Sequence, residues 1–261
     1  ANVFAVLVAA QKGEWDLLEK SIEALQNGNM RMKYLEKPVV TAPAGLALGG
    51  GCEIAMHGAR CLPNGETYIG LVEVGVGVIP AGGGCKELLV RLTEGIPSGC
   101  VEGGLNLQYH IGKAFENIAT AKVATSAMEA MELGYIRKSE TINMSRDQQI
   151  YEAKQIVLSL NVAGYKPPRP AQIPVMGENF RGLVEGIIMN MRYGKYISDY
   201  DLFVSRKVAH ILSGGDCAEG TYVSEQEILD LEREAFLSLM GETKTHERIM
   251  HMLTKGKPLR N

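Results

Sequence analysis

The sequence lacks the patterns that mark a membrane protein or a nucleic-acid-binding protein. Gly, Pro or a charged residue interrupts its longest apolar stretches well before the roughly 18 to 20 residues that a membrane span needs. Its 27 Lys and Arg residues are fewer than its 30 Asp and Glu residues, so the net charge is -3 and no basic surface for nucleic acid is expected. We therefore expect a soluble globular protein without a membrane span, whose partner is a small molecule and not a nucleic acid.

Cysteine and histidine are too irregularly spaced to indicate a disulfide framework or a metal site. The five cysteines are an odd number without a C-x-x-C pair, and the histidines show no metal-ligand spacing. The N-terminus also has no basic leader followed by a small-residue cleavage site. These absences predict reduced thiols, no bound metal and a cytoplasmic location. The cysteines are Cys52, Cys61, Cys85, Cys100 and Cys217.

Glycine, by contrast, is abundant, and 30 glycines make accidental matches to nucleotide-binding loops easy. The nearest approach to G-x-G-x-x-G begins at Gly75 and ends in Pro80 instead of glycine. The phosphate-binding pattern G-x-x-x-x-G-K-[ST] does not occur in the sequence. We therefore do not expect this chain to bind NAD or ATP through such loops.

The spacing of apolar residues predicts two regions of different character. Up to about residue 140, helical patterns alternate with a β-branched strand at 38–42 and with glycine turns, which is typical of an α/β protein. Beyond that point helical patterns dominate, and Ser224 with Glu227 forms a capping box at the start of one of them. We predict an α/β core in residues 1–140 and an all-helical region in residues 141–261. Helices are expected at 15–33, directly after 49–51, and at 86–92, 147–161, 178–193, 199–213, 225–240 and 243–255.

The most informative segment runs from Lys37 to Gly84. It contains an apolar strand that begins K-P-V-V, then A-L-G-G-G-C-E at 47–53, then E-V-G-x-G-x-I-P at 73–80. With these features in register, the segment resembles the signature of the crotonase family of enoyl-CoA hydratases and isomerases. The resemblance implies a crotonase-like (ClpP/crotonase) fold with a ββα spiral core, and an enoyl-CoA hydratase whose partner is an acyl-CoA thioester.

The residue types in this segment suit the addition of water to an α,β-unsaturated thioester. That reaction needs a base to activate water, an acid to protonate the α-carbon, and donors for the charge that develops on the thioester oxygen. Consecutive glycines at 49–51 let the backbone approach a ligand closely, and the helix that follows offers unpaired N–H groups and positive potential. Two carboxylates and two backbone N–H groups would be sufficient.

The resemblance assigns roles to individual residues. Glu53 matches the glutamate that binds and activates the water, and Glu73 matches the second catalytic glutamate, which donates the proton. The N–H of Gly50 matches an oxyanion-hole donor, and Gly49 and Gly51 beside it are expected to contact the substrate. Glutamate is usually solvated, but apolar residues flank Glu53, and those around Glu73 favour burial and a raised pKa useful to an acid. Only the family fold implies that the two carboxylates converge, because they lie on different elements.

The family's second oxyanion donor lies upstream, in a motif of the form x-A-G-A-[DN]. Only Ala1 and Asn2 would remain of that motif here, so the resemblance assigns the second donor to Ala1. The first residue is not Met and starts an apolar run, which suggests a chain truncated upstream.

The remainder of the chain resembles the C-terminal part of bacterial bifunctional 3-hydroxyacyl-CoA dehydrogenase/enoyl-CoA hydratase proteins, in which a dehydrogenase module precedes the crotonase module. This resemblance implies a role in fatty-acid β-oxidation. It also implies no cofactor in this chain, because NAD would be used only by the upstream dehydrogenase module. Crotonase relatives further imply a homo-oligomer.

Two other functions stay open. A Δ3-Δ2-enoyl-CoA isomerase would use Glu73 as its proton shuttle, although the presence of Glu53 as well favours hydration. The third hypothesis is a substrate-docking and assembly module that is inactive without the upstream part. Comparing the rates of hydration and double-bond migration on the purified protein would distinguish the hydratase from the isomerase.

Other conspicuous residues receive structural interpretations. His57 follows Glu53 by one helical turn and is interpreted as a partly exposed helical residue. A cluster of tyrosines near Met189 and Met191 indicates helix packing and not a cofactor box; its members are Tyr193, Tyr196 and Tyr200. The basic residues near the C-terminus, Arg260 among them, are interpreted as a solvated tail.

Overall fold

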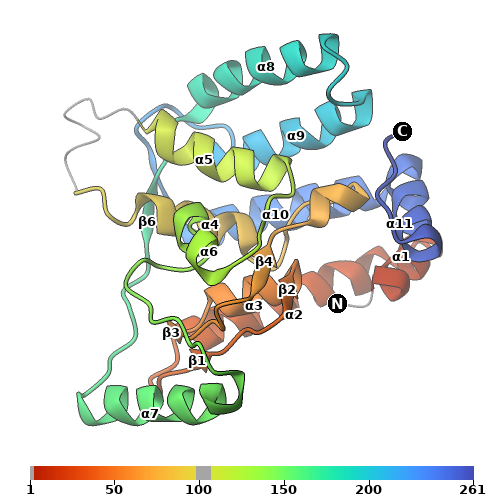
Figure 1. Ribbon diagram of the computed structural model, residues 1–261. Helices are drawn as coiled ribbons and strands as arrows, with labels where there is room; N and C mark the ends of the chain where they lie inside the picture. Colours follow the sequence, from red (N-terminus) through yellow and green to blue (C-terminus); the bar gives the residue numbers. More distant parts are fainter. Residues whose placement is uncertain (1–2, 98–106) are drawn as a thin grey trace.

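Helices make up most of the chain in a computed structural model, which describes residues 3–97 and 107–261, and short strands lie among the first helices (Figure 1). The predicted helices are all present, and the first of them begins and ends where the spacing indicated, at Trp15 and Lys33. The helices are α1 (Val3–Gln11), α2 (Trp15–Lys33), α3 (Gly50–Met56), α4 (Gly84–Thr93), α5 (Gln108–Ala119), α6 (Ala127–Leu133), α7 (Gln149–Val162), α8 (Gly177–Tyr193), α9 (Asp199–Leu212), α10 (Glu225–Met240) and α11 (Thr243–Lys255), with 3-10 turns η1 (Glu73–Val76) and η2 (Arg146–Gln148). The strands are β1 (Val40–Thr41), β2 (Leu46–Leu48), β3 (Arg60–Cys61), β4 (Tyr68–Gly70), β5 (Val123–Ala124), β6 (Gln172–Pro174) and β7 (Tyr222–Ser224).

The core repeats a unit of two strands and a helical segment. Strands β1 and β2 lead into α3, and strands β3 and β4 lead into η1 and α4. Each strand of the second unit pairs in parallel with its counterpart in the first, β3 with β1 and β4 with β2. This stacking confirms the predicted ββα spiral, and it brings the starts of α3 and η1 to corresponding ends of neighbouring strands.

The C-terminal region is helical except for one antiparallel strand pair. Strands β6 and β7 pair with Ile173 opposite Val223, and both of these apolar side chains are buried. The prediction of an all-helical region missed these strands, because each has only three residues and shows too little alternation to detect. In the chain, β6 follows the proline-rich segment at 166–170, and β7 leads directly into α10.

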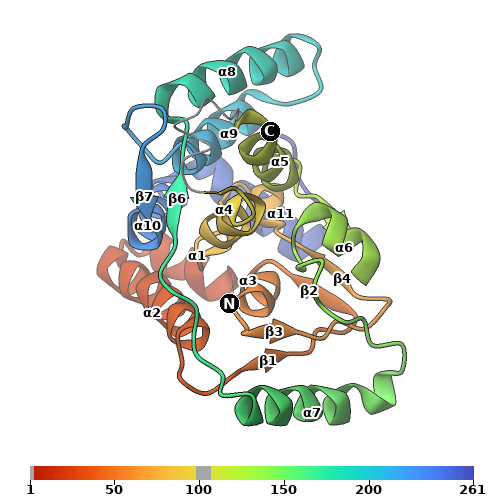
Figure 2. The same ribbon diagram turned by 90° about the vertical axis from the view of Figure 1, so that its left-hand side faces the viewer.

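Helices from the C-terminal region pack directly on the first part of the chain. Helix α10 lies against α2 and α4, and α11 lies against α1 and η1, so residues far apart in sequence share one core (Figures 1 and 2). Helix α7 lies on the opposite side of the molecule, beneath β1 (Figure 2). The division at residue 140 stays a prediction, since contacts between the two regions are extensive.

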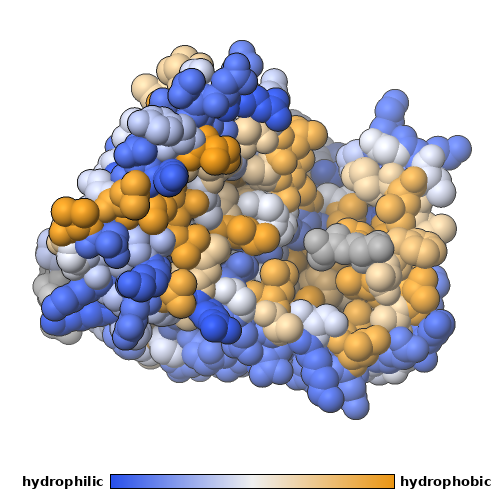
Figure 3. All heavy atoms as spheres, turned by 90° about the horizontal axis from the view of Figure 1, so that it is seen from below, coloured by the Kyte–Doolittle hydropathy of each residue, from blue (hydrophilic) through white to orange (hydrophobic). Residues whose placement is uncertain are grey.

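The lower face of the molecule, where α7 lies, has apolar groups spread over it and is hollowed in its middle (Figure 3). Helix α7 contributes to this exposed apolar surface, with Ile150 at 73% and Val162 at 87% exposure. None of the helices in residues 3–97 and 107–261 is long and apolar enough to cross a membrane.

The capping box predicted at the start of α10 is present. The hydroxyl of Ser224 accepts a hydrogen bond from the N–H of Glu227, and the Glu227 carboxylate accepts one from the N–H of Ser224. A second box, Ser198 with Asp201, starts α9. The sequence pattern missed it because its third helical residue is Asp instead of Glu or Gln.

Ser224→Ala removes the hydroxyl that accepts a hydrogen bond from the N–H of Glu227 at the start of α10, and it should lower the free energy of unfolding by about 1 kcal/mol. Urea denaturation followed by circular dichroism measures the change. Ser21→Ala is the control, because Ser21 is an exposed serine inside α2 that only donates back to the carbonyl of Leu17. Equal effects of the two substitutions would contradict a special role for the cap.

Candidate active site

The glycine turn at 49–51 sets where α3 begins. Gly49 has φ +57° and ψ -124°, a conformation that glycine adopts without the steric cost of a Cβ atom. Its N–H donates to the carbonyl of Gly70 at the end of β4, which ties the turn to the neighbouring strand. Gly50, as the first residue of α3, has an N–H that the helix itself cannot pair. Gly51 is exposed, and a Cβ atom on this residue would have no atom of either predicted glutamate within 4 Å.

Glu53 is buried at 2% exposure, and the backbone of a second glycine turn holds its carboxylate. The N–H groups of Gly82 and Gly84 donate to Oε1 of Glu53, at 2.8 and 2.9 Å. A Cβ atom on residue 82 would lie 2.4 Å from the other oxygen, Oε2, so a residue larger than glycine would displace the carboxylate. Burial raises the pKa of Glu53 to about 7, although these two hydrogen bonds and the charge of Lys86 oppose the rise.

Glu73 is the first residue of η1 and has a different environment. Its Oε2 atom is buried and has no hydrogen-bond partner among the described residues. Burial, followed by the charge of Glu53, raises the pKa of the Glu73 carboxyl to about 8. A buried oxygen without a partner is costly unless a ligand or water satisfies it, so this atom marks a place for a polar group.

The structure brings both predicted glutamates to the same glycine turn. A Cβ atom on residue 49 would lie 2.9 Å from Oε1 of Glu73, and one on residue 50 would lie 3.9 Å from Oε2 of Glu53. The N–H of Gly50 therefore lies in the same small region as the two carboxylates. The remaining predicted donor, Ala1, lies outside the described residues. The geometry permits general acid–base chemistry beside a backbone donor, and the roles assigned to these residues stay predictions.

Behind the glutamates lies a buried cluster of charges that the sequence analysis did not anticipate. Lys33 contacts the carboxylates of Glu87 and Glu225 at 2.7 and 2.8 Å, and Lys86 contacts the same two carboxylates at 2.9 and 3.0 Å. Burial alone would raise the pKa of Glu225, but the charges of Lys86 and Lys33 outweigh it and hold the pKa at about 2. The two lysines and two glutamates thus compensate one another's loss of hydration.

His57 connects this charge cluster to Glu53, and the interpretation of a partly exposed histidine is wrong. Its side chain is fully buried because Gly83 and Lys86 of the second glycine turn pack on it. The ammonium of Lys86 donates to Nε2 at 2.9 Å, which leaves the proton on Nδ1 to be donated to the carbonyl of Glu53 at 2.6 Å. Burial, reinforced by the charge of Lys86, lowers the pKa of His57 to about 3, so the ring is neutral.

Helix α10 supplies a further buried carboxylate, Glu232, which the sequence analysis also missed. Its Oε2 accepts from the N–H of Gly83 at 2.8 Å and its Oε1 from the N–H of Lys86 at 2.7 Å. The available signal was positional: Glu225 and Glu232 are seven residues apart on the stripe of α10 that also buries Ile228. A carboxylate on the apolar stripe of a helix indicates a buried partner.

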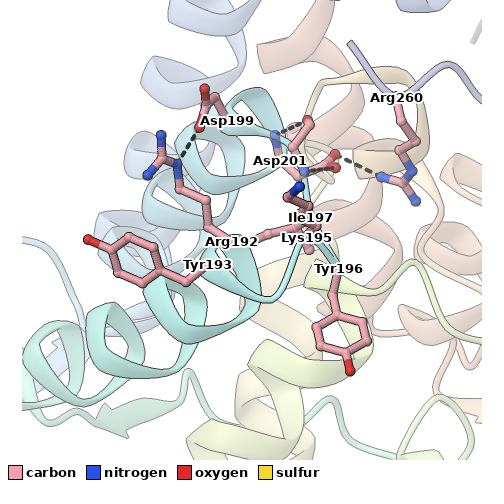
Figure 4. A pocket seen from close by; sticks show the side chains of 9 residues that line it. Arg192, Tyr193, Lys195, Tyr196, Ile197, Asp199, Asp201 and Arg260 are labelled. Atoms are coloured by element: carbon pink, nitrogen blue, oxygen red, sulfur yellow. Dashed lines mark hydrogen bonds and ion pairs between the residues drawn. The ribbon is translucent and has the colours of Figure 1, made fainter.

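A surface pocket of about 620 Å³ lies between the α8–α9 turn and the C-terminus (Figure 4), and neither Glu53 nor Glu73 lines it. Tyr193 and Tyr196 line it at 70% and 82% exposure, so the prediction that they pack between helices is wrong. Arg260 is exposed, as the interpretation of a solvated tail expects, and it also forms an ion pair with Asp201 at 2.7 Å. The described residues contain no group of three His, Cys, Asp or Glu that could hold a metal ion. The pocket is lined by Arg192, Tyr193, Lys195, Tyr196, Ile197, Ser198, Asp199, Asp201 and Arg260.

Comparison of the sequence with known proteins finds relatives that are longer than this chain. A "Probable 3-hydroxyacyl-CoA dehydrogenase" of Bacillus subtilis (strain 168) is 40% identical over 262 residues, which are 100% of this chain and 32% of that protein. A "Short-chain-enoyl-CoA hydratase" of Clostridium acetobutylicum is 47% identical over 121 residues, 45% of this chain and 40% of that protein. The chain spans about a third of the length of the first curated relatives that it matches. No family model matches the chain.

Solved structures share its fold at low sequence identity. An enoyl-CoA hydratase from Rhodobacter sphaeroides 2.4.1 superposes with a TM-score of 0.61 and 14% identity, covering 100% of this chain and 74% of that one. An enoyl-CoA hydratase from Bacillus halodurans gives a TM-score of 0.57 and 16% identity, covering 96% and 74%. These likenesses confirm the predicted crotonase fold.

The raised pKa values of the two glutamates predict how stability depends on pH. A carboxyl whose pKa is higher in the folded protein than its ordinary value of 4.5 stabilises the fold below pH 4.5, and this contribution is lost as the pH rises through the folded value. Glu73→Gln should therefore flatten the fall in the free energy of unfolding between pH 5 and 8, changing its slope by at most about 1.4 kcal/mol per pH unit.

Urea denaturation at pH 5, 6, 7 and 8 measures these slopes. Glu66→Gln is the matched control, because Glu66 is an exposed glutamate that lies just before β4, whereas Glu73 lies just after it. Parallel stability curves for the wild type and Glu73→Gln would contradict burial of the Glu73 carboxyl in its protonated form.

Proposed function

Because the chain belongs to the crotonase family, we propose that it is an enoyl-CoA hydratase module of fatty-acid β-oxidation, which adds water to trans-2-enoyl-CoA and forms 3-hydroxyacyl-CoA. The sequence relatives support a role in fatty-acid oxidation, since they include subunits named for the fatty acid oxidation complex. Syn addition of the two parts of water is part of the proposal.

The convergence of two unlike carboxylates on one glycine turn carries this proposal. Glu53 has two backbone donors on Oε1 and a pKa of about 7, whereas Glu73 has a buried, unpartnered Oε2 among the described residues and a pKa of about 8. The two carboxylates differ in their hydrogen-bond partners, and burial raises the pKa of each toward neutrality, which suits one base and one acid at neutral pH. A lone binding module would not need such a pair.

In the proposed reaction Glu53 acts as the base and Glu73 as the acid. The hydrogen bonds from Gly82 and Gly84 fix Oε1 of Glu53. The other oxygen, Oε2, lies near Gly50 of the first glycine turn and binds the water. The oxygen of this water bonds to the β-carbon while Glu53 takes one of the water protons. Glu73 gives its own proton to the α-carbon. The negative charge that builds up on the thioester oxygen is bound by the N–H of Gly50, a kind of donor that typically contributes about 10² to 10³ in rate. Ala1 is the proposed second donor.

The larger protein is part of the proposal as well. The first curated relative is named for 3-hydroxyacyl-CoA dehydrogenase activity and is about three times as long as this chain. We infer an upstream dehydrogenase module that uses NAD and receives the 3-hydroxyacyl-CoA formed here, while this chain itself needs no cofactor. Assembly into a homo-oligomer is also proposed from the family.

Glu53→Gln and Glu73→Gln should each slow the hydration of crotonyl-CoA by about 10² to 10⁴, because each removes one proton-transfer group. The loss of enoyl absorbance measures hydration, and a parallel assay of 3-enoyl-CoA measures double-bond migration. Glu66→Gln, with an exposed carboxylate, is the control and should leave both rates unchanged.

The outcomes separate the three functions. Double-bond migration that needs Glu73 but tolerates Glu53→Gln would identify an isomerase and overturn the hydratase proposal. A chain that binds acyl-CoA without hydrating it, beside an active full-length protein with the upstream module, would identify a docking module.

A further inference from the structure

Two carboxylates divide between them the backbone N–H groups at the start of α4. Glu53, from α3, accepts from Gly82 and Gly84, whereas Glu232, from α10, accepts from Gly83 and Lys86. The N–H groups alternate along the chain between the two acceptors. Both side chains are buried, at 2% and 0% exposure, so neither set of bonds is exchanged readily for bonds to water.

We propose that Glu232 is a positioning residue for the hydratase reaction: from α10 it holds the N–H groups of Gly83 and Lys86, and thereby keeps the N–H groups of Gly82 and Gly84 aimed at Oε1 of Glu53. This inference rests on the proposed function, because Glu53 is the base of that reaction. Glu232 itself acts through the turn and contacts no reacting atom.

The geometry requires a group with two acceptor oxygens at this position. Each oxygen of Glu232 binds one N–H, and the two N–H groups lie three residues apart on the first turn of α4. The turn is also held at its carbonyl side, where the amide of Asn29 donates to the carbonyl of Gly82 at 2.8 Å. With Glu53 and Glu232 on its N–H side, the turn is fixed from three helices.

The turn packs closely on the ring of His57, through a glycine in the left-handed conformation. Gly83 has φ +98°, and a Cβ atom there would lie 3.0 Å from the ring of His57. The turn therefore approaches α3 more closely than any other residue would allow. Without an acceptor for its N–H, Gly83 would leave a buried donor unpaired, which is unfavourable because the lost hydration is not replaced.

The charged and titratable groups around this site come from four elements. Glu53 is influenced by Lys86 on α4 and lies near Glu73 on η1 and Cys52 on α3. Glu232 is influenced by Glu53 and Lys86, and its charge acts on Cys85. Burial first, and then the charge of Glu53, raises the pKa of Glu232 well above its ordinary value, so a change at either carboxylate affects the other.

Positioning and direct charge repulsion predict opposite shifts. If Glu232 holds the turn, its loss weakens the N–H bonds to Glu53, and the pKa of Glu53 rises because those bonds favour the charged form. If Glu232 acted only as a neighbouring negative charge, its removal would lower the pKa of Glu53. A purely structural role would change stability and leave the pKa of Glu53 in place.

Glu232→Gln tests the proposal, because glutamine offers one acceptor oxygen to two N–H groups. We expect kcat for crotonyl-CoA to fall by about tenfold to a hundredfold with KM nearly unchanged, as for a displaced catalytic group. The acid limb of the kcat/KM profile should move upward by about one pH unit. Glu234→Gln, an exposed glutamate two residues further along α10, is the matched control and should change neither quantity.

A readout independent of activity is the titration of the Glu53 carboxyl by carbon-13 NMR, with its signal identified by its loss in Glu53→Gln. A rise of this pKa in Glu232→Gln supports positioning even if the wild type hydrates nothing, in which case only the proposed function fails. An unchanged or lowered pKa overturns positioning even in an active hydratase. If Glu232→Gln does not fold, Glu232→Asp keeps two acceptor oxygens on a shorter stem, and it should shift the pKa in the same direction by less.

Discussion

The hydrogen bonds that Gly82 and Gly84 donate to Glu53 are the interaction on which the arrangement of the site depends. A carboxylate at 2% exposure would be held largely in its neutral form without donors, and these two bonds bring its pKa back to about 7. Backbone donors also fix which oxygen is occupied. Glycine is required there because a side chain on residue 82 would occupy the position of Oε2.

The buried charges behind the turn extend this constraint into the core. Lys86 lies at the junction, because its N–H binds Glu232, its ammonium binds Glu87 and Glu225, and it also donates to His57. Buried ion pairs seldom add much net stability compared with apolar packing, since the loss of hydration offsets their attraction. Their value here is geometric, because each ammonium proton and carboxylate oxygen fixes the position of a neighbour.

The sequence predicted elements with strong local signals and missed features created by contacts between distant segments. Helices α2 and α10 could be placed because amphipathic spacing and a capping box are local, and the glycine-rich motif predicted where Glu53 and Glu73 would lie. Strands β6 and β7 are too short to give a periodic signal. Burial of His57 arises from packing of the second glycine turn and α4 on α3, and burial of Glu232 arises from packing of α10 on α4, which no local pattern encodes. A carboxylate on an apolar helical stripe was the nearest available sign.

The bond between Gly83 and Glu232 joins residues 149 positions apart, and this separation has a consequence for the order of assembly. While the chain is being synthesised, the ββα core emerges long before α10, so the glycine turn first forms without its second carboxylate. Contacts between such distant residues close late in folding, because a long loop must be ordered before they form. The ribosome-bound core therefore has Glu53 and Glu73 before it has the helix that carries Glu232.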